Sequence, residues 1–260
     1  MKITNKLKLL IIIIFIIVNI NDSKSQTYDI DFNNELYVTG INSLILTISY
    51  VNHLKFDLSE IKKISLDKNK IIFPDNLYYH NYNKSISDLS DYFLGLNIAL
   101  PIITNFNSFK ENNSLYIIYL ENLLSTFALT SLVKTTFKRA RPFNFFKNDF
   151  ENSRKDDFYS FFSGHSSLSF SSAIFNCIIF SKLNANSEYK NLVWILSLTN
   201  SSITAFLRVL AGKHFISDVI VGAIIGSSVA YLITEIHYLD NEKSVDNVNI
   251  FYPISIKIKL

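Results

Sequence analysis

Residues 207–234 read LRVLAGKHFISDVIVGAIIGSSVAYLIT, and much of the predicted fold can be argued from them. The first half carries Arg208, His214 and Asp218, whereas the second half, from Val219 to Thr234, has no charged residue. An uncharged run of this kind is typical of a buried or membrane-embedded helix. Small residues recur in it at the near-helical spacing that lets membrane helices pack closely, namely Gly222, Gly226, Ser227 and Ala230. We therefore expect a closely packed helix with a polar segment at its amino-terminal end.

Similar runs divide the rest of the chain. They cover residues 36–52, 92–109, 114–133, 166–181 and 192–207, and Glu121 is the only charge in the third of them. Together they predict an all-α fold, a bundle of five to six long apolar helices. Hydrophobic residues make up 48% of the 260 residues, which favours a membrane-embedded bundle. Because the last three runs of the chain are 16 residues long and a spanning helix needs about 20, a soluble bundle is the alternative.

The N-terminus has the pattern of an export signal. Lysines precede an uncharged run at residues 9–20, and Ser23 and Ser25 have the spacing that a signal peptidase recognises. We expect residues 1–25 to be a signal peptide that is cut before Gln26. An uncleaved N-terminal anchor is the alternative, and either of them would export the chain from Gln26 onward.

The remaining chain divides into three predicted parts. Residues 26–89 are expected to form an N-terminal region of helix and loop, residues 90–236 the core, and residues 237–260 a tail. Apolar residues alternate with others from Ile254 to Leu260, which predicts a short terminal strand.

Charge and cysteine content exclude several classes of protein. The net charge is only +3, and much of the basic excess lies at residues 134–155, which indicates a local anion site and not a nucleic-acid surface. Cys177 is the single cysteine, so neither an internal disulfide nor a cysteine-based metal site can form.

The first candidate site segment contains Lys134, Arg141 and Pro142. Lys134 and Arg141 are two helical turns apart, so we expect both on one side of a helix, with Lys138 on the same stripe and Arg139 off it. Pro142 predicts that the helix ends at or near Arg141. A guanidinium and an ammonium together can bind a phosphate, although a solvated basic helix end has the same composition.

The second segment is Ser163-Gly164-His165, directly before an apolar run. Glycine lets backbone amides approach an anion, and the start of the following helix favours negative charge. Ser163 can donate a hydrogen bond, and His165 can act as a general acid. A serine helix cap with an incidental histidine is the alternative.

The third segment is Arg208, His214 and Asp218. A histidine and an aspartate four residues apart can meet, and a carboxylate on one imidazole nitrogen leaves the other nitrogen nucleophilic. Arg208 would complete a ring of three cations that neutralises a transferring phosphoryl group. A structural His–Asp hydrogen bond or a two-ligand metal site are the alternatives, and metal is disfavoured because three cations would repel it.

The order Lys-x6-Arg-Pro, Ser-Gly-His, Arg-x5-His-x3-Asp resembles the type 2 phosphatidic acid phosphatase (PAP2) superfamily, which includes bacterial acid phosphatases and vanadium haloperoxidases. The resemblance covers residues 90–236 and implies an all-helical fold, a phosphohistidine intermediate, and no metal or cofactor. It implies that His214 is the nucleophile, that Asp218 is its partner and that His165 protonates the leaving group. The residues that it implies bind phosphate are Lys134, Arg141, Ser163, Gly164 and Arg208.

Two positions depart from the family pattern. Phe162 stands where a proline usually precedes Ser-Gly-His, and Leu207 stands where a serine usually precedes the third-segment arginine. Neither change removes a phosphate ligand or a catalytic group.

We expect a metal-independent phosphatase that acts on a lipid phosphate or diphosphate, with its site at the periplasmic face of an inner membrane. The expected exported face assumes that residues 36–52 do not span; if they span, the same count places the site in the cytoplasm. A soluble periplasmic acid phosphatase that acts on small phosphomonoesters is the alternative. A vanadate-dependent haloperoxidase, an inactive membrane protein and a transferase remain further alternatives. The sequence leaves the oligomeric state and the identity of the substrate open.

Overall fold

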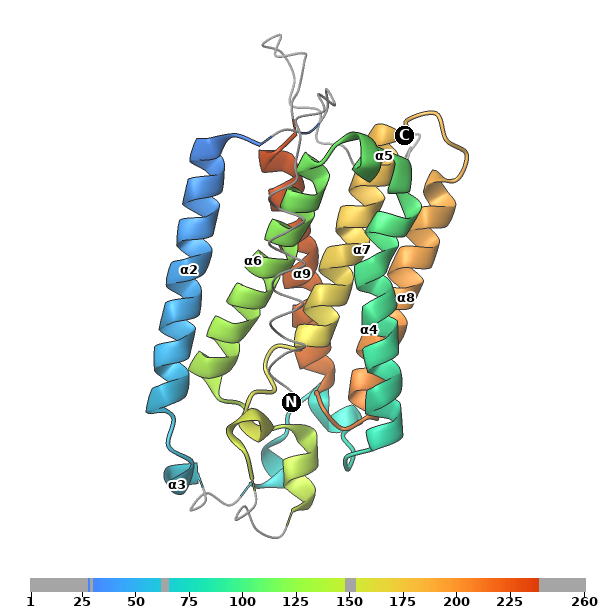
Figure 1. Ribbon diagram of the computed structural model, residues 1–260. Coiled ribbons are helices and arrows are strands. Elements are labelled where there is room, and N and C mark those ends of the chain that lie inside the picture. The colour runs from blue at the N-terminus through green and yellow to red at the C-terminus, as the bar shows by residue number, and fades with distance from the viewer. Residues whose placement is uncertain (1–27, 29, 62–65, 148–152, 239–260) are drawn as a thin grey trace, which may run out of the picture.

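The chain forms an elongated bundle of long helices, and the computed structural model describes residues 28, 30–61, 66–147 and 153–238 (Figure 1). The expected signal peptide and the expected terminal strand lie outside these residues. The long helices are α2 (Phe32–Lys55), α4 (Lys84–Thr104), α6 (Ser114–Phe137), α7 (Gly164–Leu183), α8 (Lys190–Leu210) and α9 (Ile216–Ile236). Short helices join them: α3 (Leu58–Ile61), α5 (Phe106–Glu111) and the 3₁₀ turns η1 (Lys68–Lys70), η2 (Asp75–Leu77), η3 (Pro142–Phe146) and η4 (Lys155–Phe158).

The predicted all-α fold is confirmed. Within the described residues the only extended pairing is an isolated antiparallel bridge between Tyr28 and Tyr238. The helix boundaries differ from the uncharged runs, because α4 starts at Lys84, where the side chain of Asn83 caps the helix by accepting from the amide of Ile86. The expected division between residues 89 and 90 therefore falls inside a helix.

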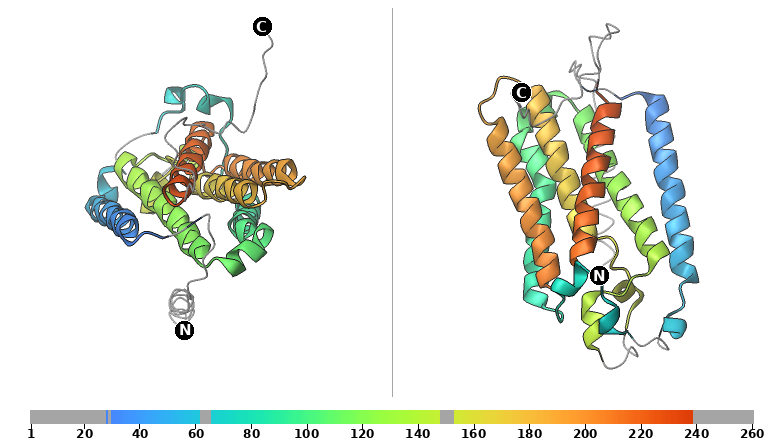
Figure 2. Two further views of the ribbon diagram at one scale, coloured as in Figure 1. Left: turned by 90° about the horizontal axis from the view of Figure 1, so that it is seen from above. Right: turned by 180° about the vertical axis from the view of Figure 1, so that it is seen from behind.

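Helix α7 is the central helix of the bundle, and the views from above and behind show α9, α8, α4 and α6 around it (Figure 2). Its serines at 166, 167, 169, 171 and 172 are all buried. Because serine is small, neighbouring backbones approach α7 closely. A Cβ atom on Gly222 of α9 would lie 2.7 Å from the carbonyl oxygen of Ser163, so only glycine permits this approach.

The outer faces of the helices are apolar. Five helices, α4, α6, α7, α8 and α9, are long and apolar enough to cross a membrane. Large apolar side chains on them point away from the bundle, including Leu96, Ile103, Phe127, Ile195, Phe206 and Ile224. An outward apolar surface of this extent is typical of a bundle with lipid around it, and the protein is a membrane protein.

Helix α2 runs the whole length of the bundle beside α6 (Figure 1). Just before its start, the backbone carbonyl of Tyr28 accepts from the Asn112 amide at 2.9 Å, beyond the end of α5. Near its other end, His53 Nδ1 lies 3.0 Å from the hydroxyl of Tyr159, in the connector between α6 and α7. Helix α2 therefore runs between opposite ends of the bundle.

Candidate active site

All eight candidate residues lie at one end of the bundle. This is the lower end in Figure 1, where α6 and α8 finish and where α4, α7 and α9 begin. The connector between α6 and α7 folds over this end, and backbone hydrogen bonds tie it together: Arg141 N to Asp157 O at 3.0 Å and Ser160 N to Arg139 O at 2.9 Å. Segments that are far apart in the sequence thus meet around one small volume.

The prediction for the end of the first helix was wrong. Helix α6 stops at Phe137, four residues before Arg141, because Lys138 adopts a left-handed conformation (φ 49°) and its amide caps the carbonyl of Lys134. Beyond this turn the expected stripe no longer exists. The ammonium of Lys138 lies over the ring of Phe56, whereas Arg139, which was expected to point away, reaches Asp218.

Lys134 and Arg141 nevertheless approach the same volume. Lys134 Nζ donates to the carbonyl of Tyr159 at 2.5 Å. Arg141 is buried; its Nη1 lies 3.2 Å from His214 Nε2, and its Nη2 lies 3.0 Å from each carboxylate oxygen of Asp156. Burial opposes ionisation of Asp156, but the charges of Arg141 and Lys134 outweigh it and hold the pKa of this carboxyl below its usual 3.8. Asp156 therefore supplies an anion to the first cation pair.

The second segment forms the start of α7. Ser163 is fully buried and caps the helix, and its backbone amide donates to the carbonyl of Asp218 at 3.0 Å. A Cβ atom on Gly164 would lie 3.8 Å from Cε of Lys134, so this glycine lies beside the first segment. His165 follows in the first turn, and its Nε2 lies 2.6 Å from Asp91 Oδ1 of α4.

Arg208 occupies the last turn of α8 and points into the bundle. Its Nη1 donates to Ser90 Oγ at 2.7 Å and lies 3.4 Å from Asp91 Oδ1. Its Nε is buried and has no hydrogen-bond partner among the described residues. A buried guanidinium with an unused donor is suited to binding an additional anion.

His214 is held in one tautomer by its two neighbours. Its Nδ1 lies 2.8 Å from the carbonyl oxygen of Ser160, which can only accept, so Nδ1 carries the proton. Its Nε2 faces Arg141, which can only donate, so Nε2 presents its lone pair. Burial, and then the charges of Lys134, Arg141 and Arg208, hold the pKa of His214 well below its usual 6.5. The imidazole is therefore neutral near pH 7 and carries a lone pair among cations.

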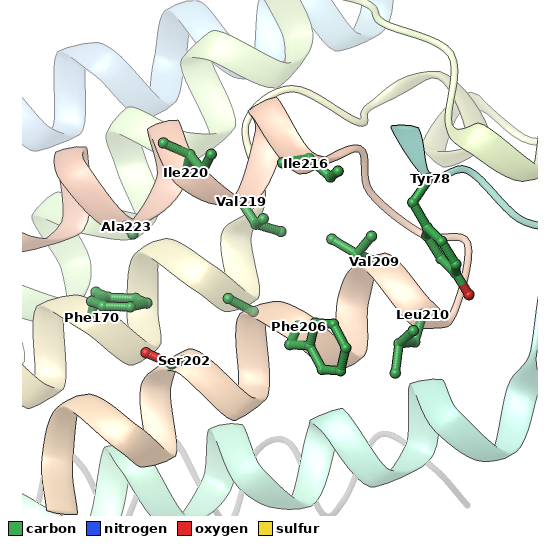
Figure 3. A pocket seen from close by; sticks show the side chains of 11 residues that line it. Tyr78, Phe170, Ser202, Phe206, Val209, Leu210, Ile216, Val219, Ile220 and Ala223 are labelled. Atoms are coloured by element: carbon green, nitrogen blue, oxygen red, sulfur yellow. The ribbon is translucent and has the colours of Figure 1, made fainter. Parts of the chain in front are cut away.

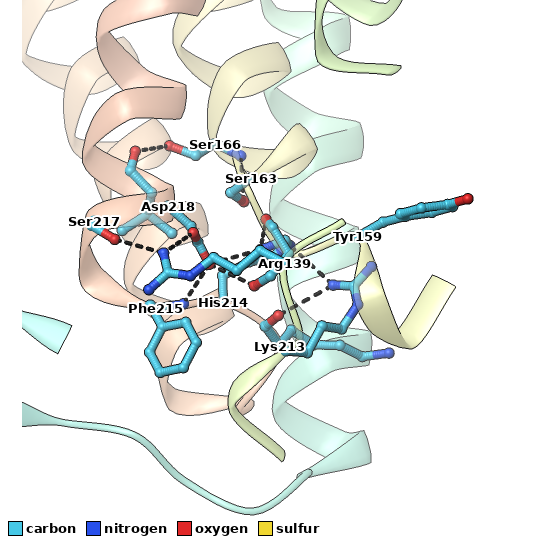
Figure 4. A network of polar contacts seen from close by, with 12 residues as sticks. Arg139, Tyr159, Ser163, Ser166, Lys213, His214, Phe215, Ser217 and Asp218 are labelled. Atoms are coloured by element: carbon cyan, nitrogen blue, oxygen red, sulfur yellow. Dashed lines mark hydrogen bonds and ion pairs between the residues drawn. The ribbon is translucent and has the colours of Figure 1, made fainter. Parts of the chain in front are cut away.

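Asp218 does not make the expected hydrogen bond to His214. Its Oδ2 lies 3.7 Å from His214 Nδ1, and it accepts instead from the hydroxyl of Ser160 at 2.5 Å and from the amide of Phe215 at 2.8 Å (Figure 4). Its Oδ1 lies 2.6 Å from Arg139 Nη1. Ser160 thus links the carboxylate to the imidazole, since its hydroxyl binds one and its carbonyl binds the other.

Several polar residues of this end were absent from the sequence prediction: Asp75, Asp91, Arg139, Asp156 and Ser160. Asp75 is buried and accepts from Arg139 Nη2 at 2.6 Å, so Arg139 bridges two carboxylates. The only available signal was the excess of polar residues around the motifs, which does not identify individual partners.

The two positions that depart from the family pattern do not remove any of these contacts. Phe162 is buried, and its ring lies edge-on to Phe161 with ring centroids 6.2 Å apart. Leu207 is partly exposed and precedes Arg208, whose guanidinium is held by Ser90 and Asp91.

In this arrangement Lys134 and two buried arginines surround a neutral histidine at one end of a membrane bundle, which is chemically suited to an anion. Residues 115–242 match the family model described as the PAP2 superfamily, and the chain belongs to that superfamily. It is a phosphatase that hydrolyses phosphate esters. The resemblance inferred from the motifs is thus confirmed.

Two known proteins are similar to this chain. An undecaprenyl-diphosphatase of Sulfolobus acidocaldarius is 24% identical over 151 residues, which are 58% of this chain and 69% of the relative. The crystal structure of a transmembrane PAP2-type phosphatidylglycerolphosphate phosphatase from Bacillus subtilis superposes with a TM-score of 0.45 at 20% identity, over 78% of this chain and 89% of the other.

Proposed function

We propose that the protein hydrolyses a lipid phosphate or diphosphate through a phosphohistidine formed on His214. The observation that carries this proposal is the tautomer of His214. Its Nδ1–H is engaged by the carbonyl of Ser160, and its Nε2 lone pair faces Arg141 at 3.2 Å. A neutral imidazole with one nitrogen anchored and the other unprotonated is what nucleophilic attack on phosphorus requires.

In the first step, Nε2 of His214 bonds to phosphorus as the bond from phosphorus to the lipid oxygen breaks. His165 gives its proton to the departing oxygen, so the lipid leaves as an alcohol or a monophosphate. Lys134, Arg141 and Arg208 neutralise the equatorial phosphate oxygens, and the hydroxyl of Ser163 and the amide of Gly164 add donors at the start of α7.

In the second step, His165 takes a proton from water, and the water oxygen attacks phosphorus. The bond from Nε2 to phosphorus then breaks, which releases inorganic phosphate and restores neutral His214. Ser160 connects the charge on Asp218 to the imidazole, so Asp218 stabilises the cation that His214 becomes in the intermediate. These steps use side chains of the chain alone, and we propose that turnover needs no metal.

Three observations favour a lipid substrate. The site lies at the end of a bundle with an apolar outer surface, and the Sulfolobus relative is named for a lipid diphosphate. An apolar pocket of about 530 Å³ also lies between α8 and α9, and it is lined by Val209, next to Arg208, and by Val219, next to Asp218 (Figure 3). This pocket offers an apolar surface at the end of the bundle that carries the site.

The side of the membrane on which the site lies depends on the side that holds residue 28. Residue 28 lies at the end opposite to the site, because α2 crosses the bundle once between them. The site and residue 28 therefore face opposite sides of the membrane, and we propose an exported site only together with a cytoplasmic residue 28. This orientation assumes that α2 crosses the membrane with the other helices, in which case a signal that exports residue 26 does not combine with a periplasmic site.

Orientation can be measured with an impermeant maleimide on intact cells. The native Cys177 is buried, so added cysteines report with little background. Asn76→Cys places a thiol at the site end, and Asn186→Cys places one at the other end; both positions are exposed. Labelling of Asn76→Cys alone supports a periplasmic site, whereas labelling of Asn186→Cys alone places the site in the cytoplasm.

The activity is tested by phosphate release from purified protein in detergent with EDTA. A lipid phosphate, a lipid diphosphate and a small soluble phosphomonoester serve as substrates, with wild type, His214→Ala and the surface variant Glu188→Gln as enzymes. We expect release by wild type and Glu188→Gln, faster with the lipids, and loss of about 10³-fold or more in His214→Ala. Full activity of His214→Ala contradicts the mechanism, and equal rates with the soluble ester contradict the lipid preference.

Quenching in SDS at alkaline pH tests the intermediate directly. ³²P from labelled lipid phosphate should remain on the wild-type protein as an acid-labile, base-stable adduct, as expected for phosphohistidine, and His214→Ala should retain none. An alkali-labile, acid-stable adduct would assign the intermediate to a different side chain.

A further inference from the structure

Three side chains with metal-binding atoms meet at the end of the bundle opposite to the candidate active site. They are Glu35 in the first turn of α2, Glu121 in α6, and His237, which caps α9. One oxygen of each carboxylate and a ring nitrogen of the histidine all lie within 4.8 Å of one another. These residues come from three different helices, so the cluster is a product of the tertiary fold.

Glu121 is a buried carboxylate without a hydrogen bond among the described residues. It is the only charged residue between 114 and 133, and its side chain is 6% exposed. Neither of its carboxylate oxygens has a hydrogen-bond partner among the described residues, and one of them points at His237 Nε2 at 3.2 Å. A buried carboxylate without hydrogen bonds is costly, so this group needs a positive partner.

His237 directs one ring nitrogen toward both carboxylates. Its Nδ1 lies 2.8 Å from the carbonyl oxygen of Ile233, which can only accept, so Nδ1 carries a proton. Its Nε2 then faces Glu35 Oε1 at 2.9 Å and Glu121 Oε2 at 3.2 Å. Histidines that bind metals usually donate their other ring N–H to a carbonyl or carboxylate in this way, which aims the free nitrogen at the ion.

We propose that Glu35, Glu121 and His237 bind one divalent transition-metal ion of the zinc class. Ligand atoms around a tetrahedral zinc ion lie about 3.4 Å apart. The two distances from His237 Nε2, 2.9 and 3.2 Å, lie within a few tenths of an ångström of this spacing, and the two carboxylate oxygens lie within 4.8 Å of each other. The two charges of the ion balance the two carboxylates. The imidazole nitrogen selects this class over Mg²⁺ and Ca²⁺, which prefer oxygen ligands, and water would complete the coordination.

The ion would have a structural role. Helix α2 packs against α6, where Asn42 Nδ2 donates to Ser125 Oγ at 2.8 Å and Ser49 Oγ lies 3.3 Å from Thr135 Oγ1. A metal on Glu35, Glu121 and His237 would fasten the start of α2 to both α6 and α9. The site lies at the other end of the helices from His214, so the ion takes no part in the phosphate chemistry.

The test is metal binding by the full-length protein in detergent. Metal is first removed with EDTA, and Zn²⁺ is then titrated calorimetrically into wild type, Glu121→Gln, Glu35→Gln and the exposed-site control Glu188→Gln. Glu35 is partly exposed, so Glu35→Gln serves if Glu121→Gln fails to fold. We expect one ion per chain in wild type and Glu188→Gln, a rise of several degrees in the unfolding temperature with Zn²⁺, and at least about tenfold weaker binding in the cluster variants.

Two further measurements separate this site from the other histidines. Co²⁺ in place of Zn²⁺ should give the intense visible absorption of a tetrahedral site, and Glu121→Gln should abolish it. His214→Ala should still bind one ion, whatever its effect on phosphate release. Absence of Zn²⁺ binding by wild type, or equal binding by wild type and both cluster variants, would overturn the proposal.

Discussion

Arg139 Nη1 and Asp218 Oδ1 form an ion pair of 2.6 Å in which the carboxylate is fully buried. The same guanidinium reaches Asp75 Oδ2 at 2.6 Å and lies over the ring of Phe215, with its central carbon 4.3 Å from the ring centre. Arg139 therefore fixes Asp218 from the side away from His214, and Ser160 transmits that position to the imidazole.

Replacement of Arg139 should impair turnover although this residue lies outside the family motifs. Arg139→Gln removes a charge-assisted hydrogen bond worth about 2 kcal/mol, which corresponds to about a 30-fold loss in kcat/KM. Steady-state kinetics on a lipid phosphate measure it, with the neighbouring Lys138→Gln as the charge-matched control. An equal effect of both substitutions would show that net charge alone matters.

Asp91 should set the proton-donor strength of His165, because its carboxylate lies 2.6 Å from His165 Nε2. Asp91→Asn should slow hydrolysis of an alkyl phosphate by about tenfold or more and that of p-nitrophenyl phosphate much less, since nitrophenolate leaves without a proton. The exposed Asp88→Asn, one turn away, is the control. Equal losses on both substrates would assign Asp91 to holding Arg208 in place.

Acid should destabilise the protein through His214. Burial, and then the cations around it, depress the pKa of His214 in the folded protein, so the unfolded chain binds more protons below about pH 6.5. The stability that this group contributes is present above that pH and is lost as pH falls, at up to about 1.4 kcal/mol per pH unit. When the pH is lowered from about 7 to about 5, the temperature of heat inactivation should therefore fall less steeply for His214→Gln than for wild type. Parallel slopes would contradict a depressed pKa.

Gly222→Ala should push α9 away from the start of α7. Its new methyl group would meet the carbonyl of Ser163 at 2.7 Å, and a backbone group in a packed helix cannot move aside cheaply. We expect a loss of about 1–3 kcal/mol in stability, together with reduced activity. Gly95→Ala is the matched control, because its methyl group would meet nothing within 4 Å. Thermal unfolding of the two variants measures the loss in stability, and phosphate release measures the loss in activity.

The apolar helices were predictable from the sequence, because a long run without charges is compatible with few structures other than a buried or membrane-embedded helix. Their boundaries were less predictable. Helix α4 begins in the polar stretch at Lys84, where an asparagine cap and not a change in hydropathy sets the start. Helix α6 ends before Pro142, because Lys138 turns the chain toward partners that lie far away in sequence.

The motifs indicated which residues would gather at the site, and all eight lie at the same end. The partners of those residues could not be predicted. Asp75 and Asp91 precede the motifs by many residues, in segments with ordinary charge patterns, and only the packing of α4 and η2 against α8 and α9 places them there. For the same reason, sequence spacing suggested a direct bond from Asp218 to His214, whereas the fold inserts Ser160 between them.

The buried serines of α7 have a consequence for how the chain is made. A helix that is rich in hydroxyl groups is a poor substrate for insertion into lipid on its own, because each hydroxyl must first find a partner. In the finished bundle, Ser171 donates to Asn122 of α6, Ser201 of α8 donates to the carbonyl of Ser169, and Ser166 donates to the carbonyl of Val219 in α9. Helix α9, the most apolar of the five, is the last to leave the ribosome. The central helix thus gains the last of these hydrogen bonds, to the carbonyl of Val219, only when α9 has been made, and a chain truncated before α9 should be a target for membrane quality control.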